Sequence, residues 1–428
     1  MTRPQRQFLY SVVCLICVPL CCFSQKFHLN LKYIQPDTLC VVADSCRLYF
    51  PRDHQGVKTF YNKLQKQLMR GTNRINVLHI GGSHVQAGYL TAQMRENLSG
   101  IRDSFNQAYS KPADRGVIFP FRSIRTNGPT DYSTDCTGQW GVSKCLSPQY
   151  NLELGISGAA MVTTDTTASV SLTLHDDVYS FNKLHVLGYS TSPGTYPIIS
   201  IGTDTLYPSI RNKQGGFLFH LPAETTNCTL SLVGVNENNP FVLRGMIPLS
   251  DRDGITYTEA GINGASVPSW LNCEALEKEL RLLPPDLVIF GIGINDAATS
   301  YDNFSPEVFK DNYRNLIERI LKVNPKTALL FITNNDCNQT MRSRRPNLNT
   351  PRAEQAFKEL AEEYNGCVFN LFQIMGGQGS AANWVSNGLM QSDRVHFTAE
   401  GYRLVADLLY NALITDFTAY CNGTYKTE

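Results

Sequence analysis

One strand-like run, followed at once by a glycine turn and a helix, constrains the fold of this chain more than any other feature. Residues 76–86 read Asn-Val-Leu-His-Ile-Gly-Gly-Ser-His-Val-Gln, and a helical segment is expected from Ala87 to Asn97. A serine between the carboxyl end of a strand and the amino end of a helix has an exposed hydroxyl, and the first helical amides point toward it. That geometry suits a nucleophile, but many helices simply begin with a serine cap. Ser83 is therefore a candidate nucleophile with a purely structural alternative.

After Ile255 the chain alternates between apolar, strand-like runs and segments of helical spacing. The run 286–292 is nearly continuous in apolar residues, which indicates a strand buried on both faces. Alternating strands and helices predict an α/β fold: a doubly wound parallel sheet of about five strands, flanked by helices, with ligands at the carboxyl ends of the strands. The expected helices are 57–69, 267–283, 305–323, 351–364 and 398–417, and the expected later strands are 286–292, 328–333 and 367–371.

Between residues 107 and 254 the texture of the sequence changes. Gly, Pro, Thr and Ser become frequent, and short alternating runs are separated by turn residues at regular intervals. This pattern is typical of an antiparallel β-sandwich. Since it falls between two α/β pieces, 25–106 and 255–428, we expect residues 107–254 to form a domain inserted into the α/β domain. The expected strands include 169–174, 184–187, 198–201, 216–219 and 229–232.

The first 24 residues have the layout of a secretory signal peptide. Two arginines precede the apolar run 8–23, and small residues suit cleavage just before Gln25. The run is too short for a comfortable transmembrane span and no other stretch reaches its length, so no stable membrane span is expected. Lipid attachment at Cys21 or Cys22 is less favoured, because Leu20 is bulky where a small residue is wanted. We expect an exported protein, either periplasmic or extracellular.

The composition is that of an ordinary globular protein, with 42% hydrophobic residues, 18% charged residues and a net charge of +1. No basic cluster is interleaved with aromatic residues, so no nucleic acid is expected as a partner. The cysteines after the signal contain no CxxC pair, and the histidines show no metal-ligand spacing, so we expect neither a metal nor another cofactor. In an oxidising compartment the best local disulfide candidates are Cys40 with Cys46 and Cys136 with Cys145.

Three later stretches, 261–265, 291–296 and 392–398, place polar residues at strand ends or in loops. Acyl transfer by a serine needs a base, a group that orients that base, and donors for the oxyanion. In the third stretch, His396 can be the base and Asp393 can hold its ring if both lie on one tight loop.

The first two stretches offer the oxyanion donors. Gly264 has a backbone amide with no side chain in the way, Asn295 has a side-chain amide, and the Ser83 amide supplies a third donor. Each feature also has a bland interpretation, since an Asp-x-x-His pattern is often a helix cap and a Gly-x-Asn-Asp pattern is often a turn. The combination of all these motifs in this order on one α/β chain is much more specific for acyl transfer than any single motif.

This order of motifs resembles the SGNH, or GDSL-type, esterase and acylhydrolase family, over roughly 76–99 and 255–417. The resemblance implies a flavodoxin-like α/β domain that needs no cofactor. It implies Ser83 as nucleophile, His396 as general base and then acid, and Asp393 as its orienting partner. It also implies an oxyanion hole made of Ser83, Gly264 and Asn295. A secreted domain of this kind with an inserted β-sandwich is similar to bacterial peptidoglycan or polysaccharide O-acetylesterases, in which the insert resembles a carbohydrate-binding module.

The chain departs from the family pattern at Gly82, where the family usually has aspartate before the nucleophile. Losing this carboxylate could loosen the turn or alter the oxyanion site. His84 is an alternative base, but adjacent side chains after a turn usually diverge, so we interpret it as a packing or substrate-contacting residue. His79 lies in the expected strand and is interpreted as structural, and Asp296 is given no role.

We therefore expect a secreted serine esterase that removes small acyl groups, acetyl above all, from an O-acylated polysaccharide or peptidoglycan through an acyl-enzyme on Ser83. Two alternatives stay open. The same chemistry could pass the acyl group to a sugar hydroxyl, which would make the protein an O-acyltransferase. Alternatively, the sandwich could do the work in a glycan-binding protein whose Gly82-bearing site is weak or inactive.

Overall fold

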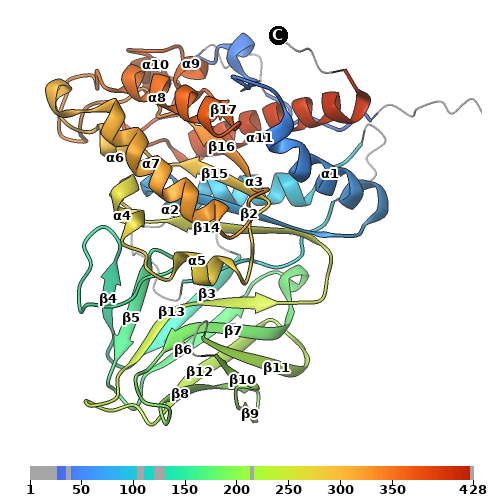
Figure 1. Ribbon diagram of the computed structural model, residues 1–428, viewed down its shortest axis with the longest axis vertical. Coiled ribbons are helices and arrows are strands. Elements are labelled where there is room, and N and C mark those ends of the chain that lie inside the picture. The colour runs from blue at the N-terminus through green and yellow to red at the C-terminus, as the bar shows by residue number, and fades with distance from the viewer. Residues whose placement is uncertain (1–26, 35–39, 104–109, 120–130, 213–215, 425–428) are drawn as a thin grey trace, which may run out of the picture.

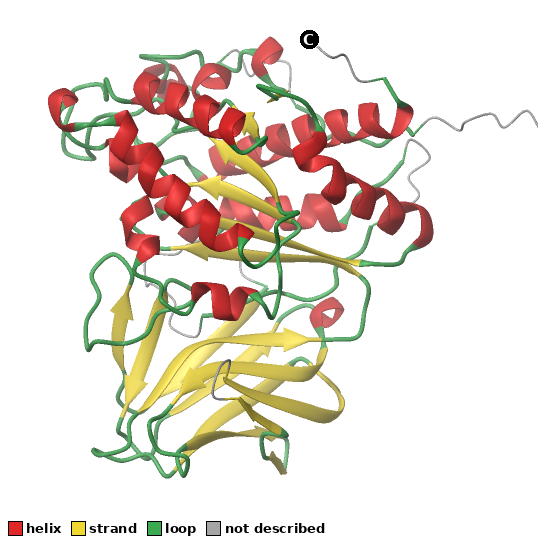
Figure 2. Cartoon of the chain, viewed as in Figure 1, coloured by secondary structure: helices red, strands yellow, loops and turns green. Residues whose placement is uncertain are grey.

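The computed structural model describes residues 27–34, 40–103, 110–119, 131–212 and 216–424, so the expected signal peptide lies outside the described residues. The chain forms two stacked parts (Figures 1 and 2): helices surround one sheet in the upper part, and the lower part consists almost entirely of strands. The middle of the sequence builds the lower part, and the segments on either side of it build the upper part together.

One six-stranded sheet organises the upper part. Five of its strands are parallel and a short edge strand is antiparallel to its neighbour, which confirms the expected α/β sheet. In spatial order the strands are β1 (Leu48–Tyr49), β17 (Cys367–Phe369), β16 (Ala328–Ile332), β15 (Leu287–Gly291), β2 (Arg74–Gly81) and β14 (Gly254–Gly261).

Strand β14 is absent from the strands that we expected, because polar residues interrupt its apolar pattern. Thr256 and Thr258 are nevertheless buried, and their hydroxyls accept hydrogen bonds from the backbone amides of Asp114 and Val117. A neighbouring segment of backbone therefore satisfies the polar side chains that made this strand hard to recognise.

Helices cover both faces of the sheet, and successive strand residues point to opposite faces. On one face, Ile289 of β15 packs in a core with α1 (Gln55–Arg70), α3 (Tyr89–Ser99) and α11 (Ala399–Asn422). On the other face, Phe290 packs in a second core with α4 (Val267–Leu271), α5 (Leu276–Leu280), α7 (Pro306–Leu321) and α8 (Thr350–Glu363). Burial on both faces explains the continuous apolar run of this strand. The remaining helices are α2 (Ser83–Gln86), α6 (Ile294–Ala297), α9 (Leu371–Met375) and α10 (Ala381–Ser386).

Two antiparallel sheets form the lower part and enclose a third core, which confirms an inserted antiparallel β domain. The first sheet has the order β10 (Ile210–Asn212), β11 (Gly216–Thr225), β7 (Phe181–Tyr189), β13 (Phe241–Leu249), β5 (Ala159–Thr163) and β4 (Gly141–Lys144). The second has the order β3 (Tyr132–Thr137), β6 (Ser169–Leu174), β12 (Asn227–Val233), β8 (Tyr196–Ile201) and β9 (Asp204–Leu206).

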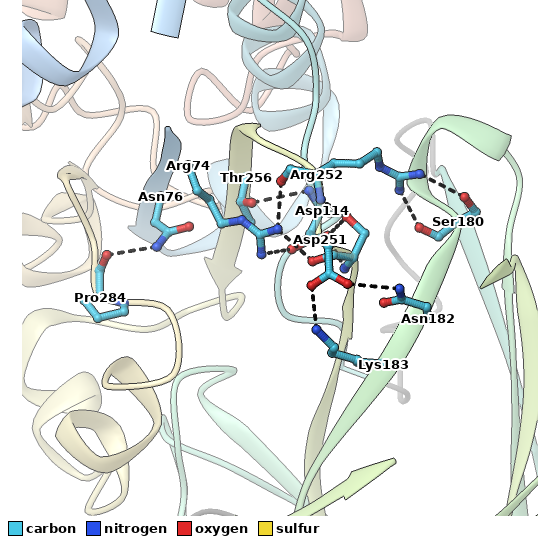
Figure 3. A network of polar contacts seen from close by, with 11 residues as sticks. Arg74, Asn76, Asp114, Ser180, Asn182, Lys183, Asp251, Arg252, Thr256 and Pro284 are labelled. Carbon is cyan, nitrogen blue, oxygen red and sulfur yellow. Dashed lines mark hydrogen bonds and ion pairs between the residues drawn. The ribbon is translucent and has the colours of Figure 1, made fainter. Parts of the chain in front are cut away.

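A polar network holds the chain where it returns from the sandwich to the sheet (Figure 3). At the start of β2, the Arg74 guanidinium pairs with Asp114 at 2.6 Å and donates to the backbone carbonyls of Ser250 and Arg252. The Arg252 side chain in turn donates to the Ser180 carbonyl of the sandwich. These bonds fix the direction in which β14 enters the sheet beside β2.

The expected helix 267–283 is wrong as a single element, because it is broken into α4 and α5. Sandwich groups bind the chain at the break: the Asn272 side chain donates to the Cys145 carbonyl at 2.9 Å, and the Ala275 amide donates to the Leu154 carbonyl at 2.8 Å. These tertiary contacts outweigh local helical spacing. Among the described residues, no helix, the 24-residue α11 included, is long and apolar enough to cross a membrane.

None of the nine cysteines that the structure describes is part of a disulfide bond, so neither expected disulfide is formed in it. Cys145 lies beside Cys273 rather than Cys136. The hydrogen bond between the Cys145 and Cys273 thiols, together with burial, raises the pKa of Cys273. Proximity in sequence suggested Cys136 as the disulfide partner of Cys145. In the fold, Cys145 instead lies next to Cys273, which is located between α4 and α5.

Candidate active site

Ser83 is the first residue of α2, directly beyond the end of β2. The turn before it is fixed by backbone bonds: the Gly81 carbonyl accepts from the Ile262 amide, and the Gly82 carbonyl accepts from the Gln86 amide at 3.0 Å. The turn is thus held without the carboxylate that the family usually has at position 82. The helix begins at the serine itself, earlier than expected, and α2 is separated from α3 by Gly88, whose φ is +84°.

The structure brings Ser83, His396 and Asp393 into one hydrogen-bonded chain. His396 Nε2 lies 3.0 Å from Ser83 Oγ, and His396 Nδ1 lies 2.8 Å from Asp393 Oδ2. The loop before α11 places the last two residues, and it is separated from Ser83 by 313 positions in sequence. A hydroxyl, an imidazole and a carboxylate in this order can transfer a proton from the serine to the ring.

Asp393 is held as a carboxylate. Its Oδ1 accepts from the backbone amides of Val395 at 2.8 Å and His396 at 3.0 Å. Burial disfavours the charged form, but the hydrogen bonds from the His396 ring and from these two amides outweigh it and lower the pKa of Asp393 to about 2. The carboxylate can therefore orient the ring over the whole range in which a histidine titrates.

The other two expected site residues lie on segments next to the serine turn: Gly264 on the loop between β14 and α4, and Asn295 in the short helix α6. A Cβ at Gly82 would lie 3.3 Å from both Asn295 Nδ2 and the Ala265 carbonyl oxygen, so both groups border this turn. The Asn295 amide donates to the Ala265 carbonyl at 2.8 Å, and its second hydrogen is left for another acceptor. Gly264 has φ +81°, and a Cβ there would come within 3.0 Å of Leu146 from the sandwich.

Asp296, to which the sequence assigned no role, connects helix α6 to the segment that contains Gly264. Its carboxylate accepts from the backbone amide of Val267, the first residue of α4, at 3.1 and 3.2 Å. Burial raises the pKa of Asp296 to about 6. This hydrogen bond fixes the distance between the loop that contains Gly264 and the helix α6 that contains Asn295.

His84 is largely buried and bonds Tyr402, which agrees with the packing role in its interpretation as a packing or substrate-contacting residue. Its Nδ1 lies 2.8 Å from the Tyr402 hydroxyl, and its Nε2 is buried. Burial, and then the neighbouring His396, lower the pKa of His84 to about 3, so the ring is neutral. His79 is likewise structural, since it is completely buried in β2 and bonds the Tyr257 hydroxyl at 2.7 Å.

A cleft of about 420 Å³ opens over the serine. Ser83, His396 and Asp393 line it, together with residues that the sequence reasoning did not single out: Gln86, Tyr89, Asn263, Met341, Gln391 and Tyr402. Only Gln86 had a usable signal, because it follows Ser83 by three positions on a helix; its side chain accepts from the Asn263 amide. The described residues contain no group of three or more His, Cys, Asp or Glu side chains that could hold a metal ion.

Residues 241–404 match the GDSL-like lipase/acylhydrolase family model. The chain contains a domain of this acylhydrolase family. By class, the protein is therefore a carboxylic ester hydrolase. The matched range contains Gly264, Asn295, Asp393 and His396 but stops short of Ser83, because the sandwich separates the serine strand from the rest of the acylhydrolase domain in the sequence.

The whole described fold also occurs in a solved structure of a peptidoglycan O-acetylesterase. That structure has a TM-score of 0.68 and 18% identity, and the likeness covers 87% of this chain and 99% of that chain. An acetylxylan esterase from Geobacillus stearothermophilus is 22% identical over 38% of this chain and 73% of its own, with a TM-score of 0.28. No curated protein matches the chain in sequence. The likeness to the peptidoglycan O-acetylesterase is the one that bears on the fold. The two proteins share both the acylhydrolase domain and the inserted domain.

Proposed function

We propose that the protein hydrolyses O-acyl esters, acetyl esters above all, on a polysaccharide or peptidoglycan through an acyl-enzyme on Ser83. The observation that carries the proposal is the hydrogen-bonded chain from Ser83 Oγ through His396 to Asp393, with contacts of 3.0 and 2.8 Å. Contact among the serine hydroxyl, the imidazole and the carboxylate favours a catalytic protein over a protein that only binds glycans.

In the proposed cycle, Ser83 Oγ attacks the ester carbonyl while His396 Nε2 takes its proton. The amides of Ser83 and Gly264 and the side chain of Asn295 stabilise the oxyanion of the tetrahedral intermediate. His396 then gives the proton to the sugar oxygen as its bond to the acyl carbon breaks, so the sugar leaves as an alcohol and the acyl group stays on the serine. A water activated by His396 hydrolyses this acyl-enzyme, and Asp393 orients the ring in every step.

The substrate class comes from the likeness to the peptidoglycan O-acetylesterase, and from the insert. We propose the division 25–106, 107–254 and 255–428, with the sandwich contacting the glycan and the expected signal peptide 1–24 directing export. Leu146 supports a role of the sandwich near the site, because this half-exposed residue lies beside Gly264.

The test is acetate release from O-acetylated peptidoglycan and from O-acetylated xylan. We expect Ser83→Ala to lower release by ~10³-fold or more, because among the described residues that line this cleft Ser83 is the one serine, threonine or cysteine. Ser386→Ala, an exposed serine at the end of α10, is the matched control and should keep full activity. Equal release by wild type and Ser83→Ala, on these substrates or on p-nitrophenyl acetate, would reject the proposal. Product analysis with an acceptor glycan separates hydrolysis from acyl transfer.

A further inference from the structure

A hairpin-like loop between β16 and α8 carries an unbalanced positive charge. Residues 338–346 read Asn-Gln-Thr-Met-Arg-Ser-Arg-Arg-Pro and contain three arginines and no acidic residue, whereas the whole chain has a net charge of only +1. The side chains of Arg342, Arg344 and Arg345 are all exposed. We refer to residues 338–346 as the arginine loop.

The arginine loop is held in a defined place. Asn338 and Pro346 form a β-bridge at its base, and the Gln339 amide donates to the Arg345 carbonyl at 2.9 Å. At its tip, the Ser343 amide donates to the Thr340 carbonyl at 3.0 Å. The loop thus has a paired stem and a closed turn, so its arginines project from a structured support.

The same loop is bonded to the residues that place the catalytic base. The Asn338 amide donates to the Arg394 carbonyl at 2.9 Å, and the Asn338 side chain donates to the Asp393 carbonyl at 3.2 Å. Met341, at the tip, lines the cleft that contains Ser83 and His396 although 62% of it is exposed. Arg342 follows Met341 directly. The positive charge therefore lies at the edge of the cleft.

These arginines differ from others of the protein in having no carboxylate partner. Arg74, Arg115, Arg244 and Arg319 each pair with an aspartate or glutamate at 3.0 Å or less. Within the part of the chain that the structure describes, Arg342, Arg344 and Arg345 form no ion pair. We refer to residues 392–398, which include Asp393 and His396, as the base loop. Glu400 is the one exposed acidic residue in the first turn of α11 after the base loop, and it does not balance three guanidinium groups.

We propose that Arg342, Arg344 and Arg345 form an anion-binding rim of the active-site cleft, and that the natural substrate is a glycan that carries carboxylates next to its acylated sugars. A guanidinium binds a carboxylate through two parallel hydrogen bonds, which gives orientation as well as attraction. The rim positions an acidic polymer so that its ester reaches Ser83. This inference rests on the proposed function. Its chemistry fits peptidoglycan, whose stem peptides carry carboxylates, and also a polyuronic acid.

The experiment compares each acidic substrate with its neutral counterpart. O-acetylated peptidoglycan and O-acetylated polygalacturonate are used as such and after carbodiimide coupling has converted their carboxylates to carboxamides. For the wild type at low salt, we expect kcat/KM to be about tenfold higher on the acidic form of the natural polymer, and we expect the ratio to fall toward one in ~0.5 M salt. The polymer with the larger ratio identifies which of the two sources supplies the carboxylates.

The variant Arg342→Gln/Arg344→Gln/Arg345→Gln should bring the ratio close to one at low salt. The control Lys58→Gln/Lys66→Gln/Arg70→Gln removes three exposed positive charges from α1 and should keep the wild-type ratio. Thermal unfolding checks that both variants are folded. A wild-type ratio near one, or an arginine-loop variant that keeps the wild-type ratio, would overturn the inference. If no polymer shows Ser83-dependent release, the proposed function itself fails, which is a different result from Ser83-dependent release without charge discrimination.

Discussion

Tyr402 forms a second link between the serine turn and the base loop, parallel to the contact between Ser83 and His396. Its hydroxyl lies 2.8 Å from Nδ1 of His84, the residue after the serine. Its ring packs against Phe397, the residue after the base, with ring centroids 5.4 Å apart. Burial raises the pKa of Tyr402, so the hydroxyl stays neutral and can bond a neutral imidazole. The separation of Ser83 and His396 thus depends on a residue that touches neither.

We expect Tyr402→Phe to lower kcat by about three- to tenfold with little change in KM. The change leaves His84 Nδ1 without a buried partner, at a cost of about 1–3 kcal/mol, and frees the serine turn relative to the base loop. Steady-state kinetics on p-nitrophenyl acetate measure the effect. Tyr410→Phe, in the same helix, removes a hydroxyl that donates to the Asn30 carbonyl and should leave kcat unchanged. A Tyr402→Phe enzyme with wild-type kcat would show that Tyr402 has no positioning role.

At the scale of elements, the two segments that we propose to supply oxyanion donors are joined at the start of α4. Asp296 of α6 accepts from the Val267 amide, so the short helix after β15 holds the helix that follows β14. The carboxylate is buried, and no cation pairs with it among the described residues. Burial of this unpaired carboxylate explains why the pKa of Asp296 is raised to about 6.

We therefore expect the contribution of Asp296 to the free energy of unfolding to decrease as pH rises from about 4 to about 6. The folded state holds this proton up to about pH 6 and the unfolded chain only to about pH 4, so the folded state binds more protons in that window. Asp296→Asn removes this contribution. We expect its free energy of unfolding, relative to wild type, to rise by about 2 kcal/mol between pH 4 and pH 6 and to stay level above it.

Urea unfolding at several pH values measures this difference. Asp393 is a control with the opposite pH dependence. Because its pKa is lowered to about 2, its contribution to the free energy of unfolding is lost only as pH falls from about 4 toward 2. A difference between wild type and Asp296→Asn that does not change between pH 4 and pH 6 would contradict the assignment.

At the scale of the whole molecule, buried ion pairs join the sandwich to the acylhydrolase domain. Arg244 of β13 pairs with Glu279 of α5 at 2.5 Å, with side chains 1% and 0% exposed. Glu279 also accepts from the Ile156 amide of the sandwich at 2.8 Å. Near the other connection, Arg115 contacts Asp131 at 2.5 Å and Glu259 of β14 at 3.0 Å. Because these contacts are buried, we expect the two parts to unfold as a single cooperative unit.

We expect Arg244→Met to destabilise the protein by about 3–5 kcal/mol, because it leaves the buried Glu279 without its cation. Lys183→Gln is the matched control: it breaks the ion pair with Asp251, whose side chain is 69% exposed, and should cost less than about 1 kcal/mol. Chemical unfolding of both variants, followed by tryptophan fluorescence, gives the comparison. Two separate transitions in the wild type would contradict the single unit.

Much of the fold followed from local patterns. The nearly continuous apolar run 286–292 predicts a strand buried on both faces, and the structure gives this strand the bounds Leu287–Gly291. The alternation in 169–174 predicts a strand of the insert with the bounds that the structure gives it. The break between α4 and α5 did not follow, because sandwich carbonyls far away in the sequence bind the chain there. Strand β14 was missed for the same reason, since remote backbone amides satisfy its buried threonines.

The order of chemical groups is already present in the sequence: a serine after the first long strand, a glycine and an asparagine in two later segments, and an Asp-x-x-His motif before the last helix. A linear order of residue types is enough for this, because each motif is read within a few positions. Which of these groups are in contact depends on the three-dimensional packing. The 3.0 Å contact between Ser83 and His396 and the placement of the arginine loop beside their cleft both join segments that are far apart in sequence. Such distances depend on how the parallel strands pack side by side, and no local pattern records them.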